Sequence, residues 1–394
     1  MSRKSTGVII TLKLDLFLNS IWTSEAAALW KKTKEPWASR LYLPNPLTYR
    51  GLCRQTMAAS ILPGLLSGAA FGASLTGAGV YQPSVIMGQL ELEDFHMLQT
   101  LLTATAGSAV LASLLQSLGY VKLSPRSFSS FNLLGSADAN VVGGALLGGG
   151  MALAGSCPGT VAAQIGLGIP SGYWTFVGGV AGGIVWTGFV RPWMARRNAQ
   201  EGAKTAGKKP CLTVHECVGV SPRVGLVVFE ALAAAAIGAA LNVKTLSANG
   251  TRHIEPVVGG LLIAGAQLVS LLIRRSMVGT STVFDELGEL FWWAVSGGQR
   301  PKSMSALAFV TGIILGSATL ARAFPTALAG TGFSDVSATR AALGGFAMAI
   351  GSRVAGGCTA GHGISGMSLM SVSSIITVAS MFISGIVVTK ALSF

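Results

Sequence analysis

Charged residues are scarce in this sequence: they make up 11% of its 394 residues, against about 25% in an ordinary soluble domain. Hydrophobic residues make up 51%, which excludes a disordered chain, because disorder requires many charges and few apolar residues. So few charges also leave too little polar surface for a water-soluble globule. Long apolar runs are present instead, and they predict a membrane protein.

Acidic residues are the rarer charged type, 15 against 28 basic residues, so the net charge is +13. In a soluble protein this excess would suggest nucleic-acid binding. Here the basic residues lie in short polar loops between apolar runs, with no aromatic residues interleaved among them. We therefore expect no nucleic-acid partner and attribute the charge to loops on the cytoplasmic side of a lipid bilayer.

Cysteine is rare, and the five residues show no spacing typical of a disulfide scaffold. Cys211 and Cys217 flank His215 in a basic loop, but zinc sites usually use closer pairs and four ligands, so we expect no metal and no other cofactor. A phosphate-binding loop, a nucleophile elbow and a zinc-protease motif are all missing from the sequence. We therefore expect no ATP coupling within this chain.

Nine apolar stretches have about the 20 residues that a helix needs to cross a bilayer. Shorter apolar pieces between them open with Gly, Pro, Ser or Thr, and we expect these to be re-entrant or broken helices that line a cavity or lie inside the protein. The spans are expected near 57–77, 97–118, 140–156, 172–190, 224–243, 256–273, 304–324, 339–357 and 370–391. The shorter pieces are expected near 80–92, 158–169, 279–294 and 358–369.

Four regions are expected along the chain. An N-terminal cytoplasmic or interfacial segment (1–56) precedes a first transmembrane half (57–190), and a basic cytoplasmic loop (191–223) precedes a second half (224–394). Because cytoplasmic loops are rich in Lys and Arg, the N-terminus of this multi-pass cell-membrane protein is expected in the cytoplasm. The basic residues expected on that side include Lys122, Arg126, Arg191, Arg196, Arg197, Lys204, Lys208, Lys209 and Arg223.

An internal repeat is the most informative pattern. Residues 143–157 can be laid on residues 344–358 at a constant offset, and both copies end an apolar glycine-rich helix with a cysteine before a helix-breaking turn. The two helices are expected to run in opposite directions, as in the inverted repeats of many secondary transporters. The alternative is that two glycine-rich helices simply pack closely. The predicted fold is an all-α polytopic membrane protein, with about nine transmembrane helices and short broken helices in two inverted repeats.

The turns after Cys157 and Cys358 are candidate substrate-binding segments. Pro158 suits the first position of a new helix, so Cys157 is expected near free backbone N–H groups and a positive dipole end that attract an anion. A neutral thiol is a soft donor that suits a sulfur anion such as thiosulfate better than a hard oxygen acceptor. The other expected contacts in the two turns are Pro158, Gly159, Thr160, Gly357 and Thr359.

Three further polar residues are candidates for the same site. Arg353 lies in an apolar helix, where an unpaired charge is costly. We interpret it either as an attractor for a divalent anion or as a structural partner of Glu230 or Asp285. His362 either hydrogen-bonds the substrate or has a structural role. Gln89 is a candidate contact in the pore.

A cluster of acidic residues follows the turn Gly279–Thr282. We interpret Asp285, Glu286 and Glu289 as the acidic first turn of a short helix that Thr280 to Thr282 cap. The alternative is a site that couples transport to a cation.

Four segments resemble the YeeE/YedE family of sulfur-compound transporters, over roughly residues 57–391. The resemblance implies a multi-helix membrane protein with inverted halves that imports thiosulfate through a narrow path, where Cys157 and Cys358 pass the ion along by S–H···S hydrogen bonds. The family's uptake proteins have a further cysteine in the early loop of the first half, where this chain has Ala78–Tyr81. The similar segments are Gly155–Thr160, Ala355–Gly366, Gly77–Gln89 and Gly279–Thr282.

These residues support three hypotheses. The favoured one is uptake of thiosulfate or a related sulfur anion across the lipid bilayer by a protein that is not an enzyme. The alternative is a membrane sulfurtransferase, in which one cysteine becomes a persulfide that serves a rhodanese-like or sulfur-carrier partner protein. A structural or sensory membrane protein is the third.

Overall fold

The computed structural model describes residues 46–133, 135–202, 210–242, 254–297, 301, 303–325 and 336–392. The chain divides into two units, Met1–Gln55 and Thr56–Phe394, and the description below concerns the second. Most of the expected N-terminal segment 1–56 lies outside the described residues, as do Lys204, Lys208 and Lys209 of the basic loop. The described residues are helices and connecting loops, with one isolated β-bridge.

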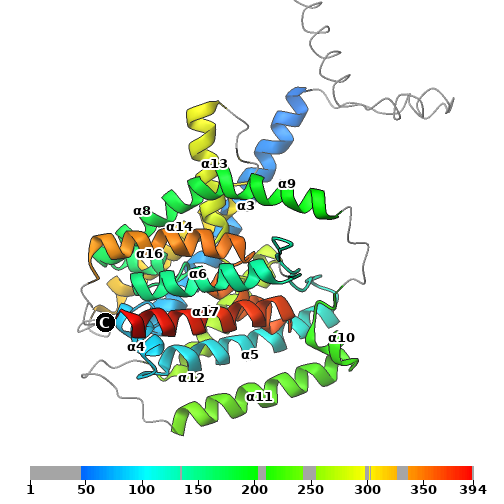
Figure 1. Ribbon diagram of the computed structural model, residues 1–394, viewed down its shortest axis with the longest axis vertical. Helices are drawn as coiled ribbons and strands as arrows, with labels where there is room; N and C mark the ends of the chain where they lie inside the picture. Colours follow the sequence, from blue (N-terminus) through cyan, green and yellow to red (C-terminus); the bar gives the residue numbers. More distant parts are fainter. Residues whose placement is uncertain are drawn as a thin grey trace, which may run out of the picture. The chain divides into compact units, whose positions relative to one another are not determined.

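A helix occupies each of the nine ranges that the sequence marks as spans (Figure 1). Six helices of the described chain are long and apolar enough to cross a bilayer: α5, the joined α8, η2 and α9, α11, α12, α14 and α17. The chain is therefore a helical polytopic membrane protein. The bounds are α3 (Pro46–Gly77), α5 (His96–Ser117), α6 (Asp138–Ala154), α8 (Pro170–Val185), η2 (Trp186–Val190), α9 (Arg191–Gly202), α11 (Pro222–Asn242), α12 (Pro256–Arg274), α14 (Ser305–Ala323), α16 (Ala338–Val354) and α17 (Val372–Ala391).

The shorter apolar pieces are also helices. α4 has Pro83 at its start, where the missing N–H of proline costs nothing, and Gly155 ends α6 with φ +57° before the turn to α7. The last of the four, η3, is a π-helix, a form often found at functional sites. Their bounds are α4 (Pro83–Glu91), α7 (Thr160–Gly166), α13 (Thr282–Ser296) and η3 (Ala360–Gly366).

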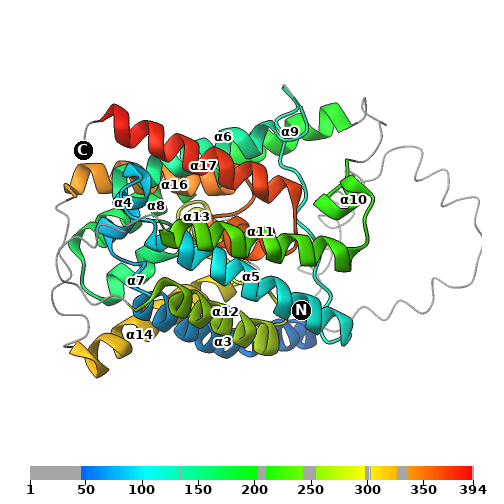
Figure 2. The same cartoon turned by 90° about the horizontal axis from the view of Figure 1, so that it is seen from below.

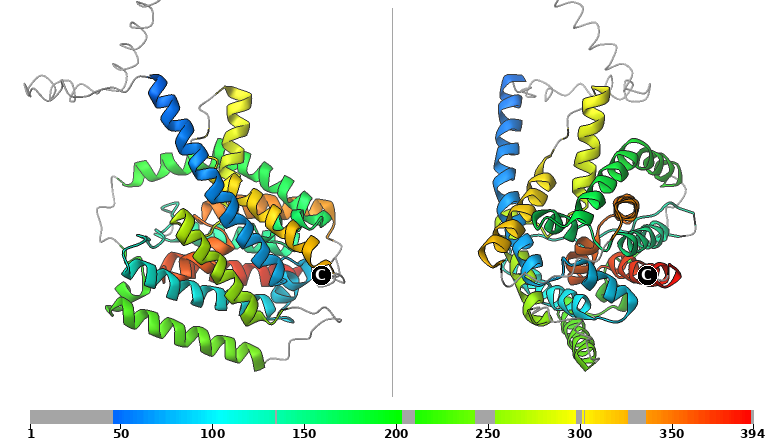
Figure 3. Two further views of the ribbon diagram at one scale, coloured as in Figure 1. Left: turned by 180° about the vertical axis from the view of Figure 1, so that it is seen from behind. Right: turned by 90° about the vertical axis from the view of Figure 1, so that its left-hand side faces the viewer.

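The two copies of the sequence repeat form α6 and α16, which pack against each other. A Cβ on Gly143 would lie 2.7 Å from the Gly351 carbonyl oxygen, and one on Gly150 would lie 2.6 Å from that of Gly344. The early part of α6 thus faces the late part of α16, so the two helices are antiparallel with their backbones in close contact. α17 lies against the other side of α6, and α8 lies against α16 (Figures 1 and 3).

α3 packs against both α12 and α14 in a second group, and α12 also packs on α5 (Figure 2). Glycine again allows the close approach, since a Cβ on Gly312 would overlap the Leu65 carbonyl oxygen of α3. The Ser74 hydroxyl of α3 donates to the Leu262 carbonyl oxygen of α12 at 3.0 Å. The short helices after the two cysteine turns contact both groups: α7 contacts α8 and α14, and η3 contacts α17 and α5.

A short helix that the sequence does not predict, α10 (Val214–Val218), lies in the basic loop. Cys211 and Cys217 form a disulfide around it, a pair that the spacing of the five cysteines did not indicate. Hydrogen bonds from the Thr213 hydroxyl and N–H lower the pKa of the exposed Glu216 carboxyl group. The two residues form a capping box, in which the Thr213 N–H donates to the Glu216 carboxylate and the Thr213 side chain accepts the Glu216 N–H. Thr213 also forms the β-bridge with Ser371, which ties α10 to the start of α17.

Candidate functional site

Cys157 lies in the buried turn between α6 and α7. Its backbone N–H donates to the Thr160 Oγ1 at 2.8 Å, and the same hydroxyl lies 3.4 Å from the Cys157 Sγ. Pro158 and Gly159 complete the turn and are buried, and Thr160 begins α7. The thiol thus lies at the break between two helices, as the sequence predicts, with a threonine hydroxyl beside it.

Cys358 occupies the corresponding break between α16 and η3 and is fully buried. Gly356, with φ +85°, ends the helix, and the Gly357 N–H donates back to the Ser352 carbonyl oxygen at 2.8 Å. The Cys358 Sγ lies 3.3 Å from the Oγ1 of Thr280, in the turn before α13. Each thiol therefore has a threonine hydroxyl as its neighbour.

Gly159 connects the two breaks. A Cβ built on it would lie 3.8 Å from the Cys157 Sγ, 3.9 Å from the Thr280 Oγ1 and 4.0 Å from the Ala360 Cβ. Because Thr280 also contacts Cys358, the surroundings of the two thiols meet inside the protein. Neither thiol faces lipid, since both side chains are 5% exposed or less.

A cavity of about 40 Å³ adjoins this meeting point. Its remaining walls are mainly apolar side chains of α3, α5 and α12. Thr359 reaches it from the second break, and its hydroxyl lies 3.4 Å from the Sδ atoms of both Met151 and Met381. The two breaks contribute Cys157, Gly159, Thr160, Thr359, Ala360 and Ile364 to its lining.

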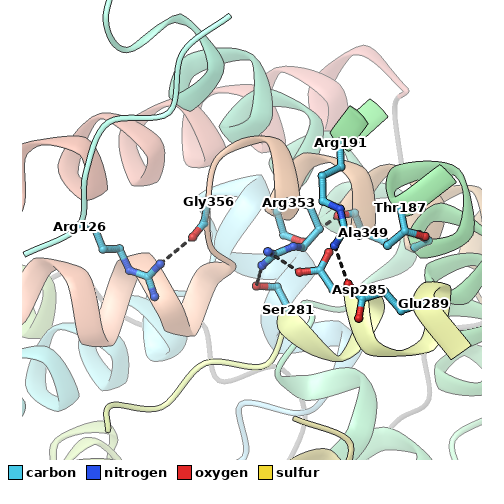
Figure 4. A network of polar contacts seen from close by, with 11 residues as sticks. Arg126, Thr187, Arg191, Ser281, Asp285, Glu289, Ala349, Arg353 and Gly356 are labelled. Carbon is cyan, nitrogen blue, oxygen red and sulfur yellow. Dashed lines mark hydrogen bonds and ion pairs between the residues drawn. The ribbon is translucent and has the colours of Figure 1, made fainter. Parts of the chain in front are cut away.

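Arg353 forms an ion pair with Asp285, one of the two structural partners considered from the sequence (Figure 4). Its Nη2 lies 2.5 Å from the Asp285 Oδ2, and its Nη1 donates to the Ser281 Oγ at 3.5 Å. The pair largely cancels the charge of Arg353, so this residue is poorly suited to attract an anion. Glu289 is paired with Arg191 in the same way, at 2.7 Å.

Replacing Asp285 with Asn is expected to destabilise the protein by about 3 kcal/mol, because the Arg353 charge would then be left poorly solvated without a partner. The two side chains are only 19% and 13% exposed. Thermal unfolding of the purified protein in detergent would measure the change. The matched control is Glu289→Gln, whose pair with Arg191 is 33% and 46% exposed and should contribute about 1 kcal/mol at most. Equal destabilisation by the two variants would contradict this interpretation.

His362 and Gln89 both have protein partners. The His362 Nδ1 lies 2.9 Å from the Ser374 Oγ, and its Nε2 lies 3.1 Å from the Ala355 carbonyl oxygen. These contacts hold η3 against α16 and α17. The Gln89 Oε1 accepts the Leu98 N–H of the first turn of α5 at 2.9 Å, and Gln89 does not line the cavity.

The acidic cluster contributes a helix cap, but at a helix different from the one expected. The Glu286 carboxylate accepts the N–H groups of Ala306 and Leu307, at 3.1 and 2.8 Å, in the first turn of α14. Asp285 lies in the first turn of α13, as expected, but the expectation that Thr280 to Thr282 cap this helix is wrong: the N-cap residue is Ser281, which makes no side-chain cap hydrogen bond, and the Thr280 hydroxyl contacts Cys358. Asp285, Glu286 and Glu289 thus all have partners within the protein.

Arg126 is a residue of the site that sequence reasoning missed, since its position in a polar loop indicated only cytoplasmic charge. It lies between α5 and α6, and its Nη1 donates to the Gly356 carbonyl oxygen at 2.7 Å (Figure 4). Its Nε donates to the Gly361 carbonyl oxygen at 2.8 Å. The guanidinium thus holds both sides of the turn that carries Cys358.

Comparison with known proteins agrees with this architecture. A family model described as sulphur transport matches residues 78–388. The "Thiosulfate transporter TsuA" of Spirochaeta thermophila is 26% identical over 326 residues, which cover 80% of this chain and 93% of that protein. Two proteins of Xylella fastidiosa, each named "Probable transporter", are 29% and 28% identical over 142 residues, 33% of this chain and 87% of each of them. These relatives are named as transporters and not as enzymes, and the family model covers most of the chain: the protein belongs to the YeeE/YedE family of sulphur transporters.

Proposed function

We propose that this protein takes up thiosulfate or a related sulfur-containing anion, with the thiols of Cys157 and Cys358 as successive hydrogen-bonding contacts. The observation that carries the proposal is the convergence of two helix breaks, far apart in the sequence, on Gly159 and Thr280 inside the protein. The family, and a relative named as a thiosulfate transporter, support the substrate class.

The chemistry of the two breaks suits a soft anion. When the Thr160 hydroxyl donates to the Cys157 Sγ, the thiol proton is free to point toward the terminal sulfur of the ion. The hydroxyl of Thr280 can do the same for Cys358. Two neutral thiols then offer weak, successive contacts, and weak contacts at several sites allow an ion to enter and also to leave.

The two halves are proposed to be inverted repeats. α6 packs on α17 as α16 packs on α8, and α6 and α16 are antiparallel. If α3, α5, α6, α8, α11, α12, α14 and α16 each cross the bilayer, α6 is the third crossing and α16 the eighth, so the two copies of the sequence repeat cross in opposite directions. A third of this chain matches most of the length of each Xylella relative. A chain of about the length of one half can therefore occur as a separate protein, which supports the division into two halves.

The proposed orientation has the N-terminus and the loops that carry Arg126, Arg191 and Arg223 in the cytoplasm. Reducing conditions there keep most thiols free, so the Cys211–Cys217 disulfide is expected to open in the cell. The halves are proposed to span 57–190 and 224–394, joined by the basic loop 191–223.

Uptake of labelled thiosulfate into liposomes that contain the purified protein tests the function. The Cys358→Ala variant is expected to fall to the level of empty liposomes, because the second soft contact is lost. A Cys211→Ser/Cys217→Ser double variant, altered at two exposed cysteines that do not line the cavity, serves as the control and should retain uptake. Wild-type rates in the Cys358→Ala variant would contradict the proposed path.

The same preparation tests the sulfurtransferase alternative. A persulfide enzyme needs a thiolate that an acceptor protein can reach, whereas Cys157 and Cys358 are both buried. We therefore expect the intact mass of the protein to stay unchanged after exposure to thiosulfate. A gain of one sulfur atom that Cys358→Ala abolishes would favour the enzyme and its partner protein.

A further inference from the structure

Arg126 has no acidic partner among the described residues, although it lies beside the second cysteine turn. Its Nη1 and Nε donate to the carbonyl oxygens of Gly356 and Gly361, which lie on either side of Cys358 in the chain. The Nη2 makes no hydrogen bond with the part of the protein that the structure describes. The guanidinium is therefore fixed in place, with one nitrogen and a full positive charge left to act on a ligand.

Glycine residues bring this nitrogen close to the thiol. A Cβ on Gly361 would lie 3.0 Å from the Arg126 Nη2 and 3.6 Å from the Cys358 Sγ, so a group of one or two atoms there touches both. A Cβ on Gly357 would lie 2.8 Å from the Arg126 Nη1. The glycines that flank Cys358 thus make room for the guanidinium.

Arg126 can also supply positive charge to a buried anion, which Arg353 cannot. A sulfur dianion that leaves water needs positive charge near its path, because burying an isolated charge is very costly. Arg353 is paired with Asp285, and Arg274, although close to the Phe309 ring, lies near the carboxylate of Glu286. Arg126 combines an unpaired charge with proximity to a thiol.

The pairing of a guanidinium with a thiol matches the two ends of thiosulfate. A guanidinium binds anionic oxygens strongly and with a preferred geometry, whereas a thiol is a soft contact for sulfur. We propose that Arg126 and Cys358 form one anion subsite, in which the guanidinium binds the sulfonate oxygens and the thiol contacts the terminal sulfur. This subsite rests on the uptake function proposed above.

Uptake by Arg126→Gln in liposomes, measured against thiosulfate concentration, tests the subsite. The loss of a charge-assisted hydrogen bond is expected to raise KM about tenfold or more. Arg126→Lys should recover much of the affinity, because it restores the charge. The matched control is Lys122→Gln, which removes the same charge from an exposed position in the same loop and should leave KM unchanged.

Inhibition of thiosulfate uptake by other sulfur anions distinguishes a ligand-binding role of Arg126 from a purely structural one. Sulfate and sulfite carry the oxygens but no terminal sulfur, so they should inhibit wild-type uptake through Arg126 and inhibit Arg126→Gln at least tenfold less well. Sulfide, which has no oxygens, should inhibit both proteins equally. Unchanged KM and unchanged sulfate inhibition in Arg126→Gln would overturn the subsite.

Two other results would also count against it. Equal loss of uptake and of melting temperature in the Gln and Lys variants would assign Arg126 a structural role only. Failure of the wild-type protein to transport thiosulfate would reject the proposed function itself, and the subsite with it. A normal wild-type rate with an unaffected Arg126→Gln variant would reject the subsite alone.

Discussion

Replacing Gly159 with alanine is expected to slow thiosulfate uptake at least tenfold while the protein remains as stable as the wild type. The added methyl group would lie between the Cys157 Sγ, the Thr280 Oγ1 and the Ala360 Cβ, at 3.8 to 4.0 Å from each. An anion that passes from one thiol to the other must cross this space. An added barrier of about 1.4 kcal/mol is already enough for a tenfold lower rate.

The fold should tolerate the same change. Gly159 has φ −80° and ψ −42°, a backbone conformation that alanine adopts readily. The three distances are those of ordinary van der Waals contact, so no neighbour has to move. Alanine also restricts the unfolded chain, which commonly stabilises a protein by about 0.4 to 1 kcal/mol at a compatible position.

Initial uptake rates and thermal unfolding of the same preparations give both readouts. Gly149→Ala is the matched control, because its Cβ would also meet only ordinary contacts, at 3.5 Å from Val388 and 3.7 Å from Ser384, away from the two thiols. We expect this control to transport normally. Normal transport by Gly159→Ala as well would mean that the anion does not pass between the two thiols at this point.

The arrangement of helices along the chain was predictable from sequence because apolar length is a local property. Each expected span and each shorter piece became a helix, including α7 and η3 beside the two cysteines. The expected length of about 20 residues per span was less accurate. α6 and α16 have 17 residues each, because both helices end at the glycines before the cysteine turns.

Side-chain partners were less predictable, because they depend on segments far apart in the chain. Thr280 has the local pattern of a helix cap, and only the folded chain brings it to Cys358, 78 residues away. Arg126 has the local pattern of a loop charge, yet it holds a carbonyl group 230 residues away. For Arg353 the sequence narrowed the structural partners to two acids, and packing selected Asp285.

Unlike Gly159, the glycines of α6 and α16 that contact the backbones of neighbouring helices leave no room for a methyl group, and alanine at Gly148 is expected to destabilise the protein and to lower the yield of folded protein. Its Cβ would overlap the Met381 carbonyl oxygen of α17, and a Cβ on Gly345 would overlap that of Thr175 in α8. Backbone atoms cannot turn aside as a flexible side chain does, so the helices would have to separate. Overpacking of this kind costs about 1 to 3 kcal/mol or more, a large part of a typical stability of about 5 to 15 kcal/mol.

Whether Gly148→Ala raises or lowers the stability of the protein distinguishes the effect of packing from that of helix propensity. Alanine is a better helix former than glycine by about 1 kcal/mol, so propensity alone predicts that Gly148→Ala stabilises α6. Packing predicts loss of folded protein, and it predicts no such loss for the neighbouring Gly149→Ala. Yield of monodisperse protein from membranes and its melting temperature measure both variants. A Gly148→Ala protein that melts with or above the wild type would show that α6 and α17 do not pack backbone to backbone, and the narrow space between the two cysteine turns would then lose its structural support.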